Sequence, residues 1–269
     1  MAVQPDRKDG SGVRVEISGV SKTYRTARGE RVHALDAVSL DLKAGEFVSI
    51  VGPSGCGKST LMMLISGLIP ASTGEIRVGG RPVAGPAPEA GIVFQRDLLL
   101  EWRTILANVL LPCEIKHQDR SRYTDKARHL LAMVGLGGFE EKYPSELSGG
   151  MRQRVAICRA LVQEPGLLLM DEPFGALDAL TREQMNLDLQ RMWGEARNTV
   201  LFITHSIEEA VFLSDRVMIM SPRPGRILDV LAVGQERPRG AHTRSERRFA
   251  ECIEHIRQLF QAQGILSEA

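Results

Sequence analysis

Residues 47–59, FVSIVGPSGCGKS, join a short apolar run to a glycine-rich turn. The run at 47–52 has the composition of a buried strand. Apolar residues then recur at the spacing of a helix: Leu61, Leu64, Ile65 and Leu68. The turn GPSGCGKS at 52–59 fits G-x-x-x-x-G-K-[ST] and lies between the expected strand and helix, which is the context that this motif requires. The stretch therefore predicts a strand–loop–helix unit that binds phosphate.

The chemistry of this turn follows from its residue types. Glycines let backbone N–H groups curl around phosphate oxygens, and the helix N-terminus adds about half a positive charge. Lys58 would neutralise the β- and γ-phosphates, and the Ser59 hydroxyl would bind Mg²⁺. A chance match is the alternative, and the strand–turn–helix context disfavours it. We expect the nucleotide to contact Gly52, Pro53, Ser54, Gly55, Cys56, Gly57, Lys58, Ser59 and Thr60.

Strand and helix patterns alternate over most of the chain. Two alternating apolar–polar segments, 13–18 and 38–42, predict strands of a separate antiparallel layer. Further strands are expected at 74–80, 91–94, 166–171, 199–205, 216–221 and 226–233. An α/β fold follows, with a P-loop NTPase core whose parallel sheet is covered by helices on both faces.

Residues 97–163 lack strand signals and read as a helical subdomain inserted in that core, with a helical pattern from about 104. A later helix has an apolar stripe that includes Met185, Leu189 and Met192, and Thr181 with Gln184 suggests a capping box at its start. A final amphipathic helix is expected at 244–263. We therefore divide the chain into a disordered tail at 1–12, one ATP-binding domain at 13–235 and a C-terminal helical extension at 236–269.

Composition limits the class of protein. The 269 residues are 43% apolar and 25% charged, and the net charge of +1 argues neither for nor against a nucleic-acid partner. No apolar run approaches the roughly 20 residues that span a bilayer, and residues 1–12 lack the apolar core of a signal peptide. The four widely spaced cysteines indicate reduced thiols in a cytoplasmic protein.

An acidic pair follows the buried strand LLLMDE at 167–172. Asp171 would hold Mg²⁺, and Glu172 would orient and polarise an attacking water. Two further strand ends carry polar side chains. His205 could reach the γ-phosphate and Gln95 could contact Mg²⁺ or the water, although either residue, taken alone, is more often simply solvated.

A second anion-binding turn lies at 147–151, LSGGM, before another helical pattern. Ser148, Gly149 and Gly150 would direct N–H groups and a helix dipole at an anion. An ordinary helix cap is the alternative. Met151 and Cys158 lie on the apolar face of that helix, so we expect their side chains in the core.

The ordered set of motifs resembles the ATP-binding subunits of ABC transporters over about residues 13–235. It comprises the turn at 52–59, Gln95, LSGG at 147–150, LLLMDE, GALD at 175–178 and His205. This resemblance implies ATP and Mg²⁺ as cofactors and a head-to-tail dimer of two copies. In that dimer, the ATP of the partner is contacted by Leu147, Ser148, Gly149, Gly150 and Met151. The catalytic residues would be Glu172, His205 and Gln95. Mg²⁺ would be bound by Ser59, Gln95 and Asp171.

The same resemblance implies that Tyr24 stacks on adenine, with a structural role as the alternative, and that Asp178 couples the two sites along the dimer seam. Leu98–Leu100 and Trp102 would receive a membrane subunit, unless they pack within the helical subdomain. Five arginines, at 237, 239, 244, 247 and 248, predict a solvated basic face or a contact with lipid headgroups.

LSGGMRQRVAICRAL and SPRPGRI are similar to the nitrate, sulfonate and taurine branch of bacterial importers. LLEW at 99–102 departs from the LLPW common in that branch, and Cys158 stands where alanine is usual. The implied protein is a peripheral ATPase on the cytoplasmic face of the inner membrane. It would energise uptake of a small anionic solute through two membrane subunits and, indirectly, a solute-binding protein. The rival classes are soluble ABC-type ATPases of assembly, translation or DNA maintenance, but the chain has a single cassette and no room for a long coiled coil between 60 and 147.

Overall fold

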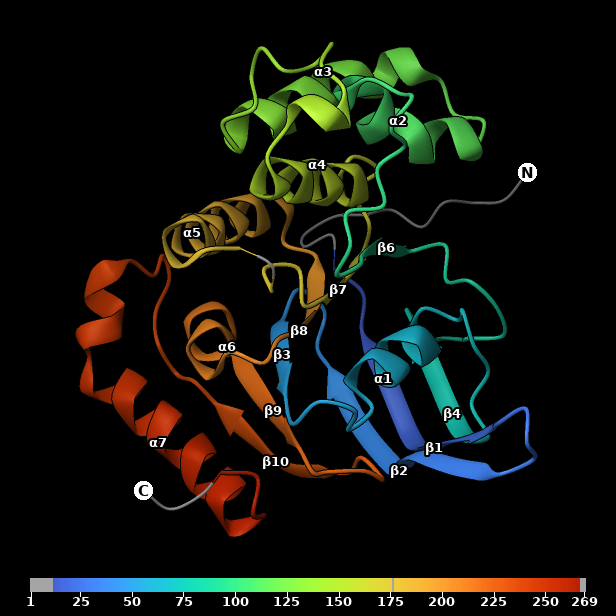
Figure 1. The fold of residues 1–269 in the computed structure, drawn as a ribbon, viewed down its shortest axis with the longest axis vertical. Coiled ribbons are helices and arrows are strands. Elements are labelled where there is room, and N and C mark those ends of the chain that lie inside the picture. Colours follow the sequence, from blue (N-terminus) through green and yellow to red (C-terminus); the bar gives the residue numbers. More distant parts are fainter. Residues whose placement is uncertain (1–11, 176, 267–269) are drawn as a thin grey trace.

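The computed structural model describes residues 12–175 and 177–266. The tail predicted at 1–12 lies, except for Gly12, outside the described residues. Two sheets stand side by side in the lower part of Figure 1, and a group of helices lies above them. The larger sheet has six strands, in the spatial order β10 (Ile227–Ala232), β9 (Arg216–Met220), β3 (Phe47–Val51), β8 (Thr199–Ile203), β7 (Leu167–Asp171) and β6 (Ala90–Val93).

Five strands of this sheet are parallel, as predicted, but β10 pairs antiparallel with β9. The connection between β9 and β10 covers only residues 221–226. A parallel return needs a crossover of about a dozen residues or more, so this short loop can only make a hairpin.

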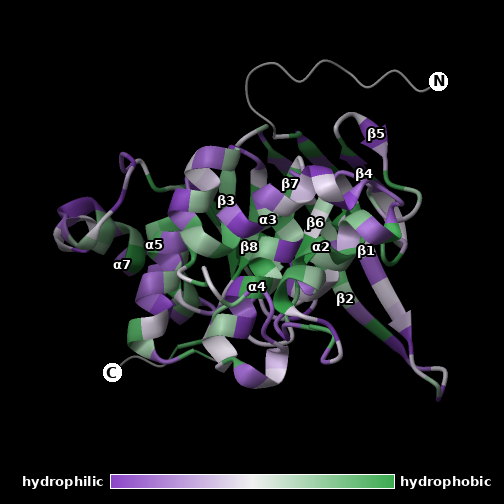
Figure 2. Cartoon of the chain, turned by 90° about the horizontal axis from the view of Figure 1, so that it is seen from above, coloured by the Kyte–Doolittle hydropathy of each residue, from purple (hydrophilic) through white to green (hydrophobic). Residues whose placement is uncertain are grey.

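Alternate residues of the central strands enter two different cores. In β3, Val48 and Ile50 pack on one side of the sheet, while Phe47 and Val51 pack on the other. The same alternation holds for β7, β8 and β9. Since both faces are buried, these strands are continuous apolar runs rather than alternating ones. Figure 2 shows the hydrophobic residues concentrated on the central strands and the hydrophilic ones on the outer helices.

The second sheet is antiparallel, as predicted, with the order β2 (Arg31–Leu42), β1 (Val15–Arg25), β4 (Thr73–Val78) and β5 (Arg81–Pro82). β1 and β2 are much longer than the predicted 13–18 and 38–42. Their register shifts between Ile17 and Val20 and again near Lys22, so the period of two is broken there. Helix α1 (Lys58–Ile65) contacts both sheets, and its residues share one core with them.

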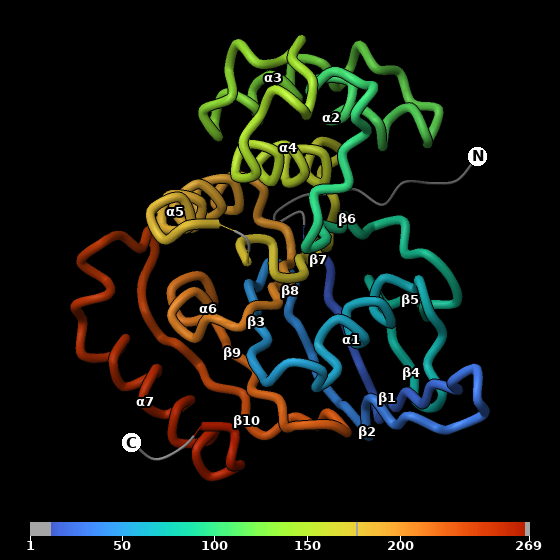
Figure 3. The backbone as a smooth tube through the Cα atoms, in the orientation of Figure 1, coloured from blue at the N-terminus to red at the C-terminus, as the bar shows by residue number. Residues whose placement is uncertain are grey.

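The helical region contains α2 (Ile105–Ile115), α3 (Arg120–Met133) and α4 (Gly149–Leu161), which lie together in Figure 3. The prediction of helix throughout 104–163 was too broad. Residues 134–148 hold only the 3₁₀ turn η1 (Pro144–Glu146). Gly135 and Gly138 have φ values of +72° and +91° there, which end the helical path.

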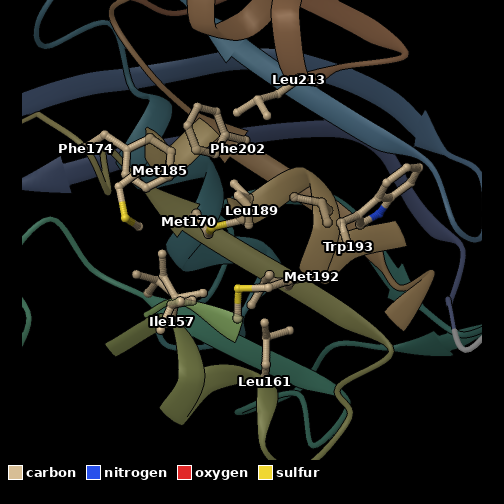
Figure 4. Packing of buried hydrophobic residues seen from close by; sticks show 14 of the residues in the cluster. Ile157, Leu161, Met170, Phe174, Met185, Leu189, Met192, Trp193, Phe202 and Leu213 are labelled. Carbon is tan, nitrogen blue, oxygen red and sulfur yellow. The ribbon is translucent and has the colours of Figure 1, made fainter. Parts of the chain in front are cut away.

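Helix α5 (Ala179–Ala196) covers the sheet face opposite α1. Its apolar stripe, Met185, Leu189, Met192 and Trp193, faces Met170 and Phe202 of the sheet (Figure 4). The predicted capping box was wrong. The N-cap is Asp178, whose carboxylate accepts a hydrogen bond from the Thr181 amide at 3.0 Å.

The chain ends with α6 (Ile207–Leu213), the β9–β10 hairpin, the 3₁₀ turn η2 (Ala241–Ser245) and α7 (Arg247–Ala262). Helix α7 buries Phe249, Cys252, Ile256 and Phe260 and packs on α6. Within residues 12–175 and 177–266, no helix is both long and apolar enough to cross a bilayer.

The five arginines at 237, 239, 244, 247 and 248 do not form one solvated or lipid-facing surface. Arg239 is only 2% exposed, and its guanidinium donates to the carbonyls of Val211, Phe212 and Ser214. Burial, followed by the charge of Arg237, lowers the pKa of Arg239 to about 10. Arg237 binds Asp215 and lies over the Trp193 ring at 4.3 Å. The segment after residue 235 is therefore anchored in the core, and of the five arginines Arg247 is the most exposed, at 93%.

Candidate nucleotide site

The phosphate loop (Gly52–Ser59) lies between β3 and α1. Gly55 and Gly57 have φ values of +75° and +108°, in the region that side chains disfavour. A Cβ at Gly57 would stand 2.6 Å from Leu35 Cδ2 and 3.0 Å from the Ala34 carbonyl oxygen. The second glycine of the motif is therefore required both by its backbone conformation and by the close approach of β2.

Lys58 braces this loop. Its side chain is almost fully buried, and its ammonium donates to the carbonyls of Gly52 at 2.8 Å and Pro53 at 3.1 Å. The Cys56 amide also donates to the Pro53 carbonyl, at 3.3 Å. The Cys56 thiol points away from solvent into the core that holds α1, and burial raises its pKa. Cys56 can thus contribute its backbone to a phosphate site, but not its side chain.

The strand order brings the acidic pair to this loop, because β3, β8 and β7 are neighbours and end at the same edge of the sheet. The Asp171 carboxylate accepts a hydrogen bond from Ser59. Burial raises the pKa of Asp171, and the Ser59 hydrogen bond opposes that shift. The neighbouring Glu172 raises the pKa of Asp171 further, and Lys58 lowers it. A hydroxyl and a carboxylate, both hard oxygen donors, therefore meet at the start of α1.

Glu172 is the meeting point of three strand ends. Its Oε2 accepts a hydrogen bond from Gln95 Nε2 at 3.4 Å and lies 3.5 Å from His205 Nδ1. These residues follow β7, β6 and β8, which are adjacent parallel strands, and ligands bind at such carboxyl edges. Glu172 has φ +45°, and its amide is held by the Ile203 carbonyl at 2.9 Å. Strained backbone of this kind concentrates at functional sites.

Tyr24 reaches the same region from the antiparallel sheet. Its hydroxyl donates to Thr60 Oγ1 at 3.3 Å, one residue beyond the phosphate loop. Lys22 lies over its ring at 5.2 Å. Tyr24 is thus beside the start of α1, although it lies far from that helix in the sequence.

The signature turn (Leu147–Met151) caps helix α4. Ser148 is the N-cap, and its hydroxyl accepts from the Met151 amide at 3.3 Å. Ser148 and Gly149 are exposed, whereas Cys158 is fully buried and Met151 packs partly buried against the same core, as predicted. Gly150 lies against α5, since a Cβ there would stand 3.0 Å from Thr181 Cγ2. Among the described residues, no hydrogen bond or ion pair joins this turn to the phosphate loop.

The docking loop (residues 97–104) carries the exposed apolar side chains. Leu98 is 50% exposed and Trp102 is 74% exposed, whereas Leu99 is buried. Leu99 therefore follows the packing alternative, whereas the side chains of Leu98 and Trp102 stay exposed. The loop is rigidly held: Arg159 donates to the carbonyls of Asp97 and Leu98, and buried Asn108 bonds Leu100, Arg103 and Thr104.

Two contacts near the site could not be predicted from the sequence. Arg152, just after the signature turn, binds Asp97 of the docking loop at 3.1 Å and the Leu147 carbonyl at 3.0 Å. The buried carboxylate of Glu209 accepts from Thr204, the residue before His205. Neither pair has a spacing that a motif would reveal.

The phosphate loop, the acid pair after β7 and the polar strand ends define a P-loop nucleotide hydrolase. The exposed turn at the start of α4 and the comparisons with known proteins narrow the class. The ABC transporter family profile matches residues 35–175, and the chain belongs to that family, as an ATP-hydrolysing member. The ADP-bound relative described below supports ATP as its nucleotide.

Curated relatives match most of the chain. The taurine import ATP-binding protein TauB of Rhizobium johnstonii is 45% identical over 260 residues, which cover 95% of this chain and 99% of the relative. An uncharacterized ABC transporter ATP-binding protein of Methanocaldococcus jannaschii is 44% identical over 233 residues, 87% of each chain.

Solved structures of dimeric cassettes share the fold. The post-hydrolysis dimer of the ATP-binding cassette MJ0796, bound to ADP and Pi, is 33% identical to this chain and superposes with a TM-score of 0.71. The match covers 82% of this chain and 100% of the MJ0796 chain. A second dimeric structure of MJ0796, a bacterial ABC transporter cassette, gives a TM-score of 0.72 with the same coverage.

Proposed function

We propose that this chain is the ATPase subunit of an importer and that its active form is a head-to-tail dimer. Each ATP lies between the phosphate loop of one copy and the signature turn of the other. The observation that carries this proposal is the exposed, Ser148-capped N-terminus of α4, which makes no polar contact with its own phosphate loop among the described residues. A helix N-terminus of this kind can bind an anion, and in the proposed dimer that anion is the γ-phosphate of the ATP held by the other copy.

Within one site, the roles follow from position. The phosphate loop and Thr60 bind the phosphates through backbone N–H groups, Lys58 and hydroxyls, and Tyr24 stacks on adenine. Glu172 orients and polarises the attacking water, His205 contacts the γ-phosphate, and Gln95 holds Glu172 from the opposite side. Asp178, exposed at the start of α5, lies along the seam between the copies.

Magnesium fits the residues at the start of α1. Among residues 12–175 and 177–266, no group of three or more His, Cys, Asp or Glu side chains is placed to hold a metal ion by itself. Mg²⁺ in phosphoryl-transfer sites instead takes one or two protein oxygens, and substrate phosphates complete its shell. Ser59, Asp171 and Gln95 supply such oxygens. The bound ion would neutralise charge on the β- and γ-phosphates.

The partners are two membrane subunits that dock on Leu98 and Trp102, with a solute-binding protein acting through them. The chain then works at the cytoplasmic face of the inner membrane. The relatives named for taurine import support a small anionic solute such as a sulfonate, taurine or nitrate. The exposed tryptophan of this loop supports docking on a separate subunit. Growth of a deletion strain on single sulfur or nitrogen sources identifies the solute.

Mixing two inactive variants tests the composite site. Ser148→Arg removes the signature contact and Lys58→Ala removes the phosphate contact, so each homodimer has no intact site. A mixed dimer has one. A 1:1 mixture therefore recovers up to about a quarter of wild-type ATP hydrolysis, since half of the dimers are mixed and each has one good site.

The control for the mixing experiment is Ser145→Arg, an exposed serine three residues before the signature serine. It hydrolyses ATP like the wild type. The composite site is refuted if the Ser148→Arg homodimer alone turns over normally.

A further inference from the structure

Glu209 is a buried carboxylate that the mechanism above does not use. It lies on the short helix α6 and is 6% exposed. Burial raises the pKa of Glu209, and a hydrogen bond from Thr204 and the charge of Arg182 oppose this shift. Charged groups are almost never buried without a partner. The contacts of the two carboxylate oxygens therefore identify the elements that Glu209 joins.

One oxygen fixes the chain on both sides of His205. Thr204 Oγ1 donates to Glu209 Oε2 at 2.5 Å and accepts a hydrogen bond from the Ser206 amide at 3.0 Å. The Ser206 hydroxyl in turn caps α6 by accepting from the Glu209 amide at 3.3 Å. Thr204, before His205, therefore bonds the Glu209 carboxylate directly, and Ser206, after His205, is linked to that carboxylate through the Thr204 hydroxyl.

The other oxygen faces α5. Glu209 Oε1 lies 3.4 Å from Arg182 Nε, close enough for Coulombic attraction but without the alignment of a hydrogen bond. Arg182 Nη2 donates to the Leu177 carbonyl at 2.9 Å. Leu177 and Thr181 are the residues that Gly150 of the signature turn lies against. The chain of contacts thus runs from His205 to the signature turn through one ion pair.

We propose that Glu209 and Arg182 form a positioning pair that couples the two ATP sites of the dimer. The inference rests on the proposed function, because only in a head-to-tail dimer do His205 and the signature turn of one chain lie at different nucleotides. A shift of the His205 loop around one γ-phosphate is passed through Glu209 and Arg182 to the Leu177–Thr181 turn. That turn supports Gly150 at the other nucleotide.

The physical reason for a charged pair here is geometric rather than energetic. A buried ion pair adds little net stability compared with apolar residues of the same size, since desolvation offsets the attraction. It does, however, fix the relative position of two elements that otherwise meet through few side chains. The pair joins the first turn of α6, which follows β8 and His205, to the first turn of α5.

The test compares four single charge-neutralising variants of the full chain and the double variant of Glu209 and Arg182. Glu209→Gln keeps the shape and an acceptor for Thr204, and Arg182→Gln removes the partner. The matched controls are Glu208→Gln, the exposed neighbour of Glu209, and Arg191→Gln, an exposed arginine on the same helix as Arg182. ATP hydrolysis is measured against ATP concentration, together with Tm.

We expect a Hill coefficient approaching 2 for the wild type and both controls, since a dimer has two sites, and close to 1 for Glu209→Gln and Arg182→Gln. The double variant should resemble the single ones. A purely structural role would lower Tm and the maximal rate while cooperativity remained. If Glu209→Gln does not fold, Arg182→Gln, at a side chain that is 31% exposed, provides the same comparison.

Unchanged cooperativity in Arg182→Gln overturns the proposal, and so does a wild-type Hill coefficient of 1, because the pair would then have nothing to transmit. Failure of the composite site itself appears elsewhere, as normal ATP hydrolysis by the Ser148→Arg homodimer. The two failures are therefore distinguishable.

Discussion

His205 Nδ1 and Glu172 Oε2 lie 3.5 Å apart, across the ends of the adjacent strands β8 and β7. The same carboxylate oxygen accepts the amide of Gln95 from β6. Neighbours on both sides thus fix the carboxylate while it stays partly exposed to solvent. A general base needs this combination of fixed orientation and access to water.

Replacing Glu172 by glutamine should separate binding from hydrolysis. The amide retains the contacts with Gln95 and His205 but cannot polarise water, so we expect a fall in kcat of roughly 10²–10⁴-fold with ATP affinity preserved. The variant should accumulate as an ATP-bound dimer on size-exclusion chromatography. Glu30→Gln, on the exposed β1–β2 turn, is the control. Near-normal turnover by Glu172→Gln would remove this residue from the role of base.

Each part of this candidate site can be proposed from the sequence because each part is local. A glycine turn after an apolar run, or an acid at a strand end, requires only the strand and its immediate neighbours. The parallel order then brings Asp171, Glu172 and His205 to one edge without further information. The signature turn is likewise a local N-cap, at Ser148.

What the sequence does not reveal depends on contacts between distant elements. The arginines at 237 and 239 look like a solvated run, yet Arg239 is buried because the last carbonyls of α6 need donors. The N-cap of α5 falls on Asp178 rather than Thr181 because the chain is already extended at 178. Similarly, the partner of Arg152 is Asp97, 55 residues away.

Trp102 provides a test of the docking loop. Trp102 is 74% exposed, and the backbone of the docking loop is held by hydrogen bonds from Asn108 rather than by the tryptophan. Trp102→Ala should therefore leave the ATPase activity and Tm of the isolated chain unchanged. Exposed aromatic residues that become buried at an interface commonly contribute about 2 kcal/mol or more, so affinity for the membrane subunits should fall by roughly 30-fold. Co-purification with those subunits measures the loss.

The control for the docking prediction is Ile115→Ala, which is 68% exposed at the far end of α2. It should bind the membrane subunits normally. Equal binding by the tryptophan and isoleucine variants would contradict the assignment of the docking loop.

The four cysteines should react slowly in the native protein. All four are at most 1% exposed, and burial raises the pKa of each thiol, so little reactive thiolate forms at pH 7–8. An aromatic disulfide reagent should therefore titrate close to four thiols in denaturant and almost none in buffer. Rapid labelling of Cys56 in the native chain, at a rate that Mg-ATP suppresses, would show that its thiol faces the nucleotide instead of the core.

Arg239 should be the arginine of the C-terminal segment that matters most for stability. Arg239→Met keeps the length of the side chain but leaves the carbonyls of Val211, Phe212 and Ser214 without their charged donor. Hydrogen bonds to a charged group contribute about 1.5–3 kcal/mol, and buried acceptors left unpaired add their desolvation cost. We therefore expect the free energy of unfolding to fall by about 3 kcal/mol.

Urea denaturation of Arg239→Met and Arg247→Met provides the measurement. Arg247 is 93% exposed and pairs with Glu251 one turn away, so its replacement should change the free energy of unfolding by less than about 0.5 kcal/mol. Because the Arg239 guanidinium also secures the end of α6, whose other end follows His205, the surviving folded Arg239→Met protein should hydrolyse ATP more slowly. Equal stability of the two variants would mean that α6 keeps its last carbonyls satisfied without Arg239.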